Sequence, residues 1–270
     1  MSETLIDIGA NLTHESFSSD LDQVLARAKD SGVAFLIVTG SSALESERAA
    51  ALAESYPDLL RATAGIHPHE AKSFDNTTIQ RLRDCARSPF TVSLGECGLD
   101  FFRDISPRTV QMDCFEAQLE LAAELQLPLF IHERDAADEM QNVLMRYRHR
   151  LNRVVIHCFT GDRRALIGYL DMDLHIGITG WICDERRGGH LHDIVGLIPA
   201  NRLMVETDSP YLMPRTIKPR PKSRRNEPCN LPYVVATLAH CLGIRAETVA
   251  ARTTSTASEF FALGDTLLCT

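Results

Sequence analysis

The feature that most constrains the fold of this chain is a series of eight short apolar segments spaced along its whole length. Each segment is four to seven residues long, and most are nearly continuous runs of apolar residues. Such runs are typical of strands that are buried on both faces of a parallel sheet. The predicted strands are residues 5–8, 33–39, 61–66, 91–96, 129–132, 154–157, 174–178 and 203–206.

The stretches between these segments have the spacing of amphipathic helices. Leu21, Val24, Leu25 and Ala28, for example, follow the i, i+3, i+4, i+7 pattern of one helical face. Further helices are expected at residues 79–85, 107–125, 140–144, 191–198, 232–242 and 246–263.

Eight strands that alternate with helices predict a (β/α)8 TIM barrel, and 270 residues is an ordinary length for one. The alternative is an open doubly wound sheet, which usually has a Gly-rich turn after its first strand. Residues 7–11, Asp-Ile-Gly-Ala-Asn, are not such a turn. No linker or repeat divides the chain, so residues 1–270 are expected to form a single barrel domain.

Composition limits where the protein works and what it contacts. The formal net charge is −8, so any nucleic acid must be held by a local basic patch or a metal ion. The eight cysteines include no Cys-x-x-Cys pair and are read as reduced thiols. The N-terminus lacks the basic and apolar regions of a signal peptide, and no apolar run is long enough to cross a membrane. We therefore expect a soluble, cytoplasmic protein, and a monomer.

Ionisable residues stand at the ends of most of the predicted strands, where barrel enzymes carry their active sites. A charged group after an apolar strand is costly unless it has a partner. Carboxylate oxygens and imidazole nitrogens are ligands that suit divalent metals, and separate strands can bring them to one ion. His69 lies close to this set, but His67 is preferred because it follows its strand directly. The residues are Asp7, His67, Glu96, His132, His157 and Asp208.

A strongly basic stretch follows the eighth predicted strand. Residues 215–225 contain six Lys and Arg side chains, the last two being Arg224 and Arg225. Loops after the last strands of a barrel often hold phosphate groups, so this stretch favours an anionic substrate over a merely solvated loop. Trp181, the only tryptophan, follows the seventh strand and is either a base-stacking or a packing residue.

With these residues in view, the sequence resembles the TatD family of metal-dependent nucleases along nearly its whole length. The segments that carry the resemblance are residues 65–69, 95–100, 131–135, 156–161, 177–181, 206–212 and 224–228. The resemblance implies an amidohydrolase-like barrel with a divalent metal, magnesium first, with manganese or zinc as alternatives. It also implies 3′–5′ exonuclease activity on single-stranded DNA or RNA, with a role in the repair of oxidative DNA damage.

The resemblance also implies roles for individual residues. Glu96, His132 and His157 would hold the metal, and Asp208 would be a further ligand or would orient the attacking water. Glu96 and Asp208 would thus be the catalytic carboxylates. Contacts with the substrate are expected from His67, Arg134, Trp181, Arg224 and Arg225.

The first strand departs from the family pattern. Many members carry Asp-x-His-x-His there, whereas this chain has Gly9 and Asn11 in place of the two histidines. Two nitrogen ligands are lost, which puts a tightly held two-metal centre in doubt and shifts the ligand set toward oxygen. Asp7 and Asn11 are left as possible extra contacts to metal or water.

Two other functions stay open at this stage. A barrel hydrolase of a small amide, ester or lactone would use a similar ligand set, although none of the predicted strands ends in the lysine that often bridges metals in such enzymes. A nucleic-acid-binding relative without catalysis is the second alternative, because the histidine pair is missing.

Overall fold

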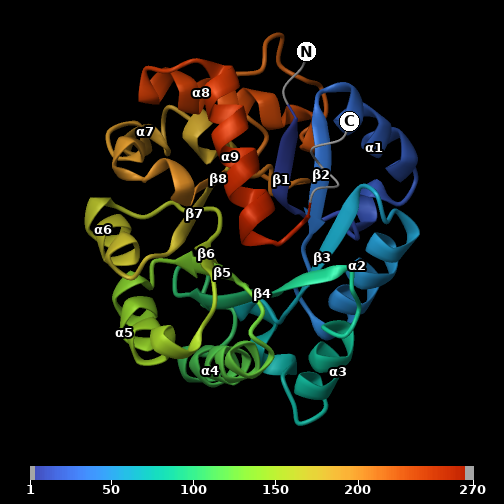
Figure 1. Cartoon of the computed structure of the whole chain (residues 1–270), viewed down its shortest axis with the longest axis vertical. Helices are drawn as coiled ribbons and strands as arrows, with labels where there is room; N and C mark the ends of the chain where they lie inside the picture. The colour runs from blue at the N-terminus through green and yellow to red at the C-terminus, as the bar shows by residue number, and fades with distance from the viewer. Residues whose placement is uncertain (1–3, 265–270) are drawn as a thin grey trace. The chain divides into compact units, whose positions relative to one another are not determined.

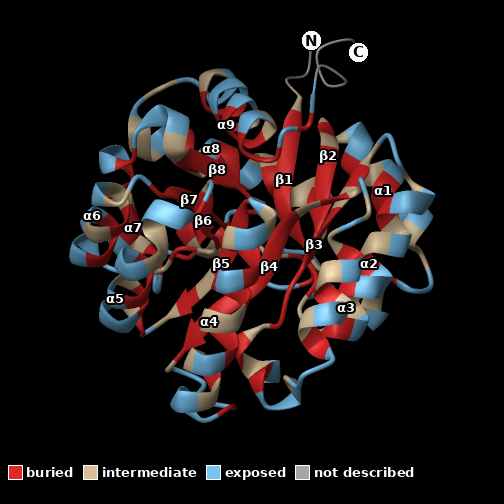
Figure 2. Ribbon diagram, turned by 60° about the horizontal axis from the view of Figure 1, so that its bottom comes forward, coloured by how far each residue is buried: buried red, intermediate tan, exposed pale blue. Residues whose placement is uncertain are grey.

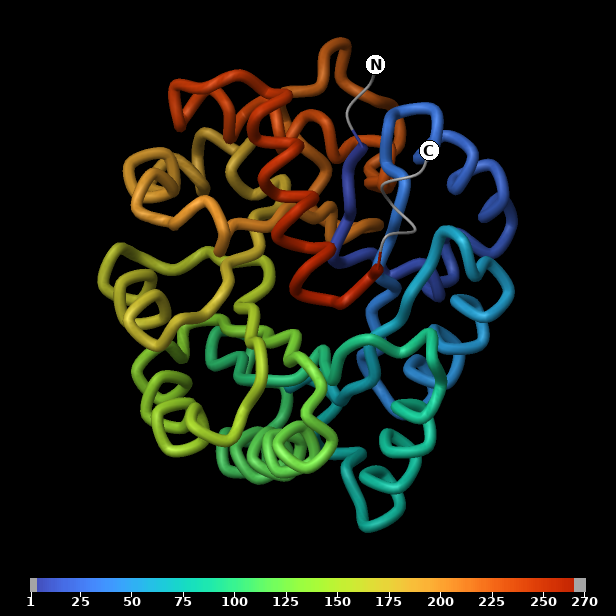
Figure 3. The backbone as a smooth tube through the Cα atoms, in the orientation of Figure 1, coloured from blue at the N-terminus to red at the C-terminus, as the bar shows by residue number. Residues whose placement is uncertain are grey.

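The computed structural model describes residues 4–264, which form two compact units. The first unit contains residues up to Val38 together with residues from Ile176 onward, and the second runs from Thr39 to His175. The first unit is therefore built from both ends of the chain, as the blue and red ends of the tube show (Figure 3). Residues 1–3, which belong to the N-terminal stretch for which no signal peptide was predicted, lie outside the described residues.

The first unit is a set of parallel strands with helices beside them. β1 pairs with β2 in parallel, and β7 pairs with β8 in parallel. A bridge between Ala10 and Ser209 links the end of β1 to the segment after β8. The elements are β1 (Leu5–Ala10), α1 (Leu21–Asp30), β2 (Val33–Val38), β7 (His175–Ile178), α7 (Gly189–His192), β8 (Leu203–Val205), α8 (Leu231–Leu242) and α9 (Ala246–Phe260).

The second unit repeats the same plan with four parallel strands in the order β3-β4-β5-β6. In Figure 1 its helices α3, α4 and α5 lie on one side of these strands. Figure 2 shows the strands almost entirely in the colour of buried residues, as expected for strands covered on both faces. The elements are α2 (Ala43–Ser55), β3 (Leu60–Ala64), α3 (Thr78–Cys85), β4 (Thr91–Asp100), α4 (Arg108–Leu125), β5 (Leu129–Arg134), α5 (Ala137–Tyr147), β6 (Val154–Ile156) and α6 (Arg163–Asp171).

All eight predicted strands are present, but β4 is longer than the sequence suggested. It continues past Glu96 to Asp100 and stays paired with β5, with Gly98 opposite His132. Gly98 makes this possible because its φ is +142° and a Cβ there would lie 2.0 Å from the His132 carbonyl oxygen. Glu96 therefore lies within the strand, and Asp100 is the residue at its end.

The helix expected over residues 191–198 is not continuous, so that prediction was wrong. The segment contains the short α7 and a separate 3-10 turn at Val195–Leu197. Gly196 lies within the interrupted part, and glycine is unfavourable in a helix interior.

The seven cysteines within the described residues are free thiols, as predicted. No single helix of residues 4–264 combines the length and apolar character of a membrane span, although the bent pair Pro228–Leu242 and Ala246–Phe260 passes these two criteria together.

Candidate metal centre and basic cavity

Three imidazole rings of the second unit converge on one oxygen of Glu96. The Oε1 atom of Glu96 lies 2.7 Å from His157 Nε2, 3.0 Å from His132 Nδ1 and 3.4 Å from His67 Nε2. Glu96 comes from β4 and His132 from β5. His157 directly follows β6, and His67 lies just beyond the end of β3. Phe130 stacks on the His157 ring at a centroid distance of 4.4 Å and so fixes its orientation.

The electrostatics of this group fit a ligand set for a cation. Burial alone would raise the pKa of Glu96, but the neighbouring histidines outweigh it and hold that pKa well below its usual range. Burial lowers the pKa of His67 to about 3, so its ring is neutral at pH 7. A carboxylate that stays ionised beside a neutral imidazole is what a divalent metal requires of its ligands.

His67, Glu96 and His132 can point ligand atoms at a common position. One donor atom from each lies within 4.8 Å of the other two. His132 Nδ1 faces Glu96 Oε1 at 3.0 Å, while its buried Nε2 lies 3.5 Å from Asp100 Oδ2. A carboxylate beside the second nitrogen is the usual support of a metal-binding histidine. The residues present therefore fit a divalent metal.

His67 belongs to the strand-end group that the sequence predicted, and the resemblance assigned it to substrate phosphate. In the structure it lies in the candidate ligand group with Glu96 and His132. Its place directly after a buried strand was the right signal, but the ring turns toward the carboxylate of the neighbouring strand.

A second carboxylate–histidine pair in the same unit was missed. Asp100 Oδ2 lies 2.7 Å from His69 Nε2 and 3.5 Å from His132 Nε2. Burial would raise the pKa of Asp100, but His132, His69 and the Arg103 backbone amide lower it below its usual range. Asp100 thus ties His69 to the candidate ligand His132. The signal was present in the sequence, because both residues belong to segments that carry the family resemblance.

The first unit holds the other predicted carboxylates. Asp208 accepts a hydrogen bond from the Asn11 amide at 3.0 Å, and its backbone amide donates to the Gly9 carbonyl at 2.8 Å. Asp7 is fully buried and accepts hydrogen bonds from the Thr207 hydroxyl and amide at 2.5 and 2.9 Å. Burial raises the pKa of Asp7 to about 7. Gly9 and Asn11, which stand where many family members have histidine, thus hold the turn that carries Asp208.

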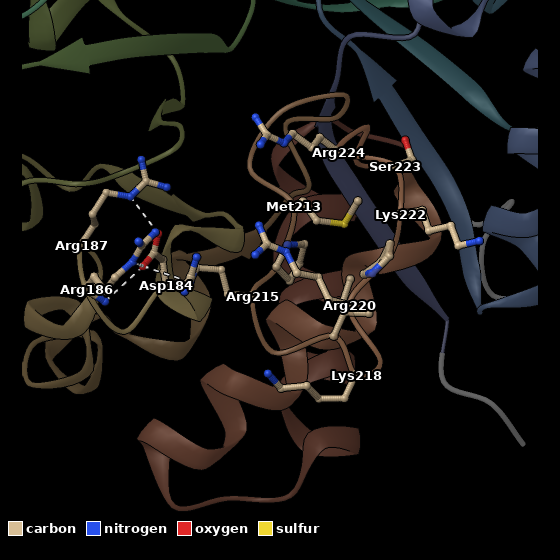
Figure 4. Close-up of a pocket in the computed structure, with 13 residues that line it drawn as sticks. Asp184, Arg186, Arg187, Met213, Arg215, Lys218, Arg220, Lys222, Ser223 and Arg224 are labelled. Atoms are coloured by element: carbon tan, nitrogen blue, oxygen red, sulfur yellow. Dashed lines mark hydrogen bonds and ion pairs between the residues drawn. The ribbon is translucent and has the colours of Figure 1, made fainter.

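A basic cavity of about 710 Å³ opens in the first unit (Figure 4). Three of its arginines, Arg186, Arg187 and Arg215, surround the buried carboxylate of Asp184 at 2.8 to 3.5 Å. The other cations of the lining form no hydrogen bond or ion pair with a carboxylate of residues 4–264. These are Lys218, Arg220, Lys222 and Arg224.

The two predicted neighbours Arg224 and Arg225 have different surroundings. Arg224 is exposed and lines the cavity. Arg225 instead donates two hydrogen bonds to Asp20 and one to Glu227, at 2.7 to 2.8 Å. Its guanidinium is therefore paired with carboxylates of its own unit.

Trp181 and Arg134 each form a stack with another side chain of their own unit. The guanidinium of Arg187 lies 4.3 Å from the centre of the Trp181 ring. Arg134 lies 4.9 Å from the centre of the Phe102 ring, and it donates a hydrogen bond to the Thr160 hydroxyl at 3.2 Å.

Alternating strands and helices, together with a carboxylate–imidazole group in or just beyond the carboxyl-terminal halves of the strands, define a barrel hydrolase of the metal-dependent type. Comparison with known proteins makes this specific. The model of the TatD-related DNase family matches residues 6–262, and the chain belongs to this family.

Two curated relatives are each 49% identical over 259 residues, which cover 96% of this chain. Both are named 3′-5′ ssDNA/RNA exonuclease TatD, and they come from Erwinia billingiae and Pantoea sp. strain At-9b. The matches cover 99% and 100% of those proteins.

A solved structure supports the fold. YJJV, a TatD homologue from Escherichia coli K12, superposes with a TM-score of 0.89 at 27% identity, over 98% of this chain and 100% of that one. The predicted (β/α)8 TIM-barrel class is confirmed.

Proposed function

We propose that this chain is a divalent-metal-dependent exonuclease that removes nucleotides from the 3′ end of single-stranded DNA or RNA. The observation that carries the proposal is the convergence of three imidazoles on Glu96, in a chain 49% identical to proteins named as exonucleases of this kind. The basic cavity supports a polyanionic substrate, because Lys218, Arg220, Lys222 and Arg224 have no carboxylate partner within residues 4–264.

The second unit supplies the groups that would hold the ion. Glu96, His132, His67 and His157 form the proposed ligand set, with Glu96 kept ionised by its histidine neighbours. A bound divalent ion would lower the pKa of a water molecule and offset charge on the phosphate. Asp100 orients the His132 ring from its other nitrogen, as carboxylates commonly do for metal-binding histidines.

The remaining roles are assigned to residues of both units. Asp208 is proposed to align the attacking water and accept its proton, and the Asn11 amide fixes that carboxylate through Oδ1. Arg134 and Arg224 are proposed to contact substrate phosphates. Asp7 is proposed to support the turn of Asp208 through Thr207 rather than to bind a metal.

Digestion of labelled oligonucleotides tests the proposal. Purified protein is incubated with single-stranded DNA or RNA labelled at the 5′ end, with Mg²⁺, Mn²⁺, Zn²⁺ or EDTA. We expect a ladder that shortens from the 3′ end with Mg²⁺ and no products with EDTA. A 3′-terminal phosphorothioate should stop the ladder at its first step. Internal cuts, or full activity in EDTA, would refute the exonuclease mechanism.

The same assay separates the alternatives. A hydrolase of small esters, amides or lactones would turn over such compounds faster than oligonucleotides, and the basic cavity argues against it. A binding protein without activity would retain the oligonucleotide in EDTA and in Mg²⁺ alike. Loss of digestion in both Glu96→Gln and Asp208→Asn, at unchanged folding, would exclude it.

Finer features are part of the proposal. Magnesium is proposed as the working metal, because the loss of two histidines from the first strand favours oxygen ligands. A single domain over residues 1–270, a monomeric state, a cytoplasmic location and a role in repair of oxidised DNA are proposed with it. Sedimentation of the purified protein and growth of a deletion strain under peroxide test the second and the last of these.

A further inference from the structure

The turn after β4 displays an aromatic ring to solvent beside the candidate metal centre. Phe102 is 60% exposed, and Ile105 in the same turn is 49% exposed. The guanidinium of Arg134, from the end of β5, lies 4.9 Å from the centre of the Phe102 ring. The turn thus presents a flat apolar surface with a cation on it.

This turn is held in place although its side chains are exposed. The Arg103 amide donates to Asp100 Oδ1 at 2.7 Å, and the Phe101 amide donates to the Arg134 carbonyl at 2.9 Å. Lys72 Nζ donates to the Ile105 carbonyl at 2.8 Å. A backbone that is fixed before a ligand arrives loses little freedom on binding, which favours a preorganised contact.

The same carboxylate connects the turn to the proposed metal ligands. Asp100 Oδ1 holds the Arg103 amide, while its Oδ2 lies 2.7 Å from His69 Nε2 and 3.5 Å from His132 Nε2. The Phe102 ring is therefore attached to the candidate centre through a single buried side chain. The turn that carries Phe102 is thus anchored on a residue that contacts the candidate ligand His132.

We propose that Phe102, with Arg134, is a stacking platform for the nucleobase next to the phosphodiester that is cleaved. The inference rests on the proposed function and assigns a substrate contact within it. Aromatic faces and guanidinium planes stack on every base, so such a platform orients a strand end without selecting its sequence. An amide, ester or lactone substrate would have no use for it.

Three variants and a modified substrate test the platform. Phe102→Ala removes the ring, Phe102→Leu keeps apolar bulk without a π face, and Phe102→Trp enlarges the face. Each is assayed on an oligonucleotide with a normal 3′ end and on one with abasic sites at its last two positions. Met145→Ala on α5, at a residue 59% exposed, is the matched control because it removes an exposed apolar side chain elsewhere in the unit.

The platform predicts a loss that depends on the base. Phe102→Ala should raise KM about tenfold on the normal strand and less than about twofold on the abasic strand, in line with the energy of base stacking on aromatic rings. Phe102→Leu should resemble Phe102→Ala, Phe102→Trp should stay close to wild type, and Met145→Ala should have the wild-type KM. Equal losses on both strands, or none, would overturn the proposal.

A binding measurement separates this inference from the proposed activity. A strand with 2-aminopurine at its 3′ end is titrated with protein in EDTA, where no hydrolysis is expected. Stacking should quench the fluorescence in wild type and not in Phe102→Ala. Quenching without any metal-dependent digestion would reject the proposed activity and keep the platform. Digestion by wild type with identical quenching in both proteins would reject the platform alone.

Discussion

Replacing either of two adjacent arginines, Arg224 and Arg225, by alanine should have different consequences, although nothing in the sequence distinguishes them. Arg225 donates hydrogen bonds to the Ser16 carbonyl at 2.6 Å and to Glu227 at 2.7 Å, besides its two bonds to Asp20. Its side chain is 23% exposed, and Arg224 next to it is an exposed residue of the cavity lining. Arg225→Ala should therefore weaken the fold, and Arg224→Ala should weaken the contact with the substrate.

The magnitude follows from the bonds that are lost. The bonds to Ser16 and Glu227 contribute about 1 kcal/mol each, after allowance for solvent. The ion pair with Asp20, in which both side chains are 23% exposed, adds little to this sum because water screens it. Arg225→Ala should thus lose about 2 kcal/mol of unfolding free energy, or about 4–8 °C in Tm for a chain of this size. Arg224→Ala should change Tm by less than about 2 °C.

Two measurements distinguish these effects. Thermal unfolding gives the stability, and oligonucleotide affinity at several salt concentrations gives the number of phosphates neutralised. Arg224→Ala should reduce the slope of log affinity against log salt by about 0.7, the value for one contact with a single strand, and Arg225→Ala should leave the slope unchanged. The reasoning is refuted if Arg225→Ala keeps the wild-type Tm and reduces the slope.

Three further variants follow from the site and its supports. Glu96→Gln should lower Mg²⁺-dependent kcat at least about a hundredfold in the oligonucleotide assay, since even partners that only orient ligands cost 10–100-fold; activity within threefold of wild type would exclude Glu96 as a ligand. Gly98→Ala should destabilise the fold by about 2 kcal/mol or more in urea unfolding, because the new Cβ would lie 2.0 Å from the His132 carbonyl oxygen. Gly189→Ala is its control, because nothing lies within 4 Å of a Cβ there. Burial raises the pKa of Asp7 from an ordinary value of 3.8 to about 7 in the folded protein. The stability linked to its proton is therefore present below pH 4 and is lost as pH rises through 7. The free energy of unfolding, measured with urea in EDTA, should therefore fall by up to about 4 kcal/mol between pH 4 and pH 8 in wild type, and Asp7→Asn should lack this fall. Equal falls in the two proteins would contradict this.

The sequence was informative about the fold because buried strands leave a simple signature. All eight strands were predicted, most of them from nearly continuous apolar runs, since strands covered on both faces have few polar positions to interrupt them. The end of β4 was not predicted, because the four residues after Glu96 look like a loop by composition. In the structure the segment stays paired with β5 as far as Arg134, and the close approach of Gly98 to the His132 carbonyl needs a residue without a Cβ.

Candidate ligands were easier to predict than their partners. Glu96, His132 and His157 were recognised because each follows an apolar run, and that rule depends on the chain alone. The pairing of Asp100 with His69, and of Arg225 with Asp20, joins residues 31 and 205 positions apart. No local pattern distinguishes an arginine that binds phosphate from one that a distant carboxylate neutralises. Arg224 and Arg225 therefore looked equivalent in the sequence.

A crystal of the protein soaked in manganese, measured for anomalous scattering, tests the central claim most directly. We predict a peak at about 2.0–2.2 Å from a Glu96 carboxylate oxygen, with imidazole nitrogens of His67, His132 or His157 completing its coordination. The peak should be absent from Glu96→Gln crystals treated in the same way. Manganese bound elsewhere, with the Glu96 group empty in wild type, would contradict the account.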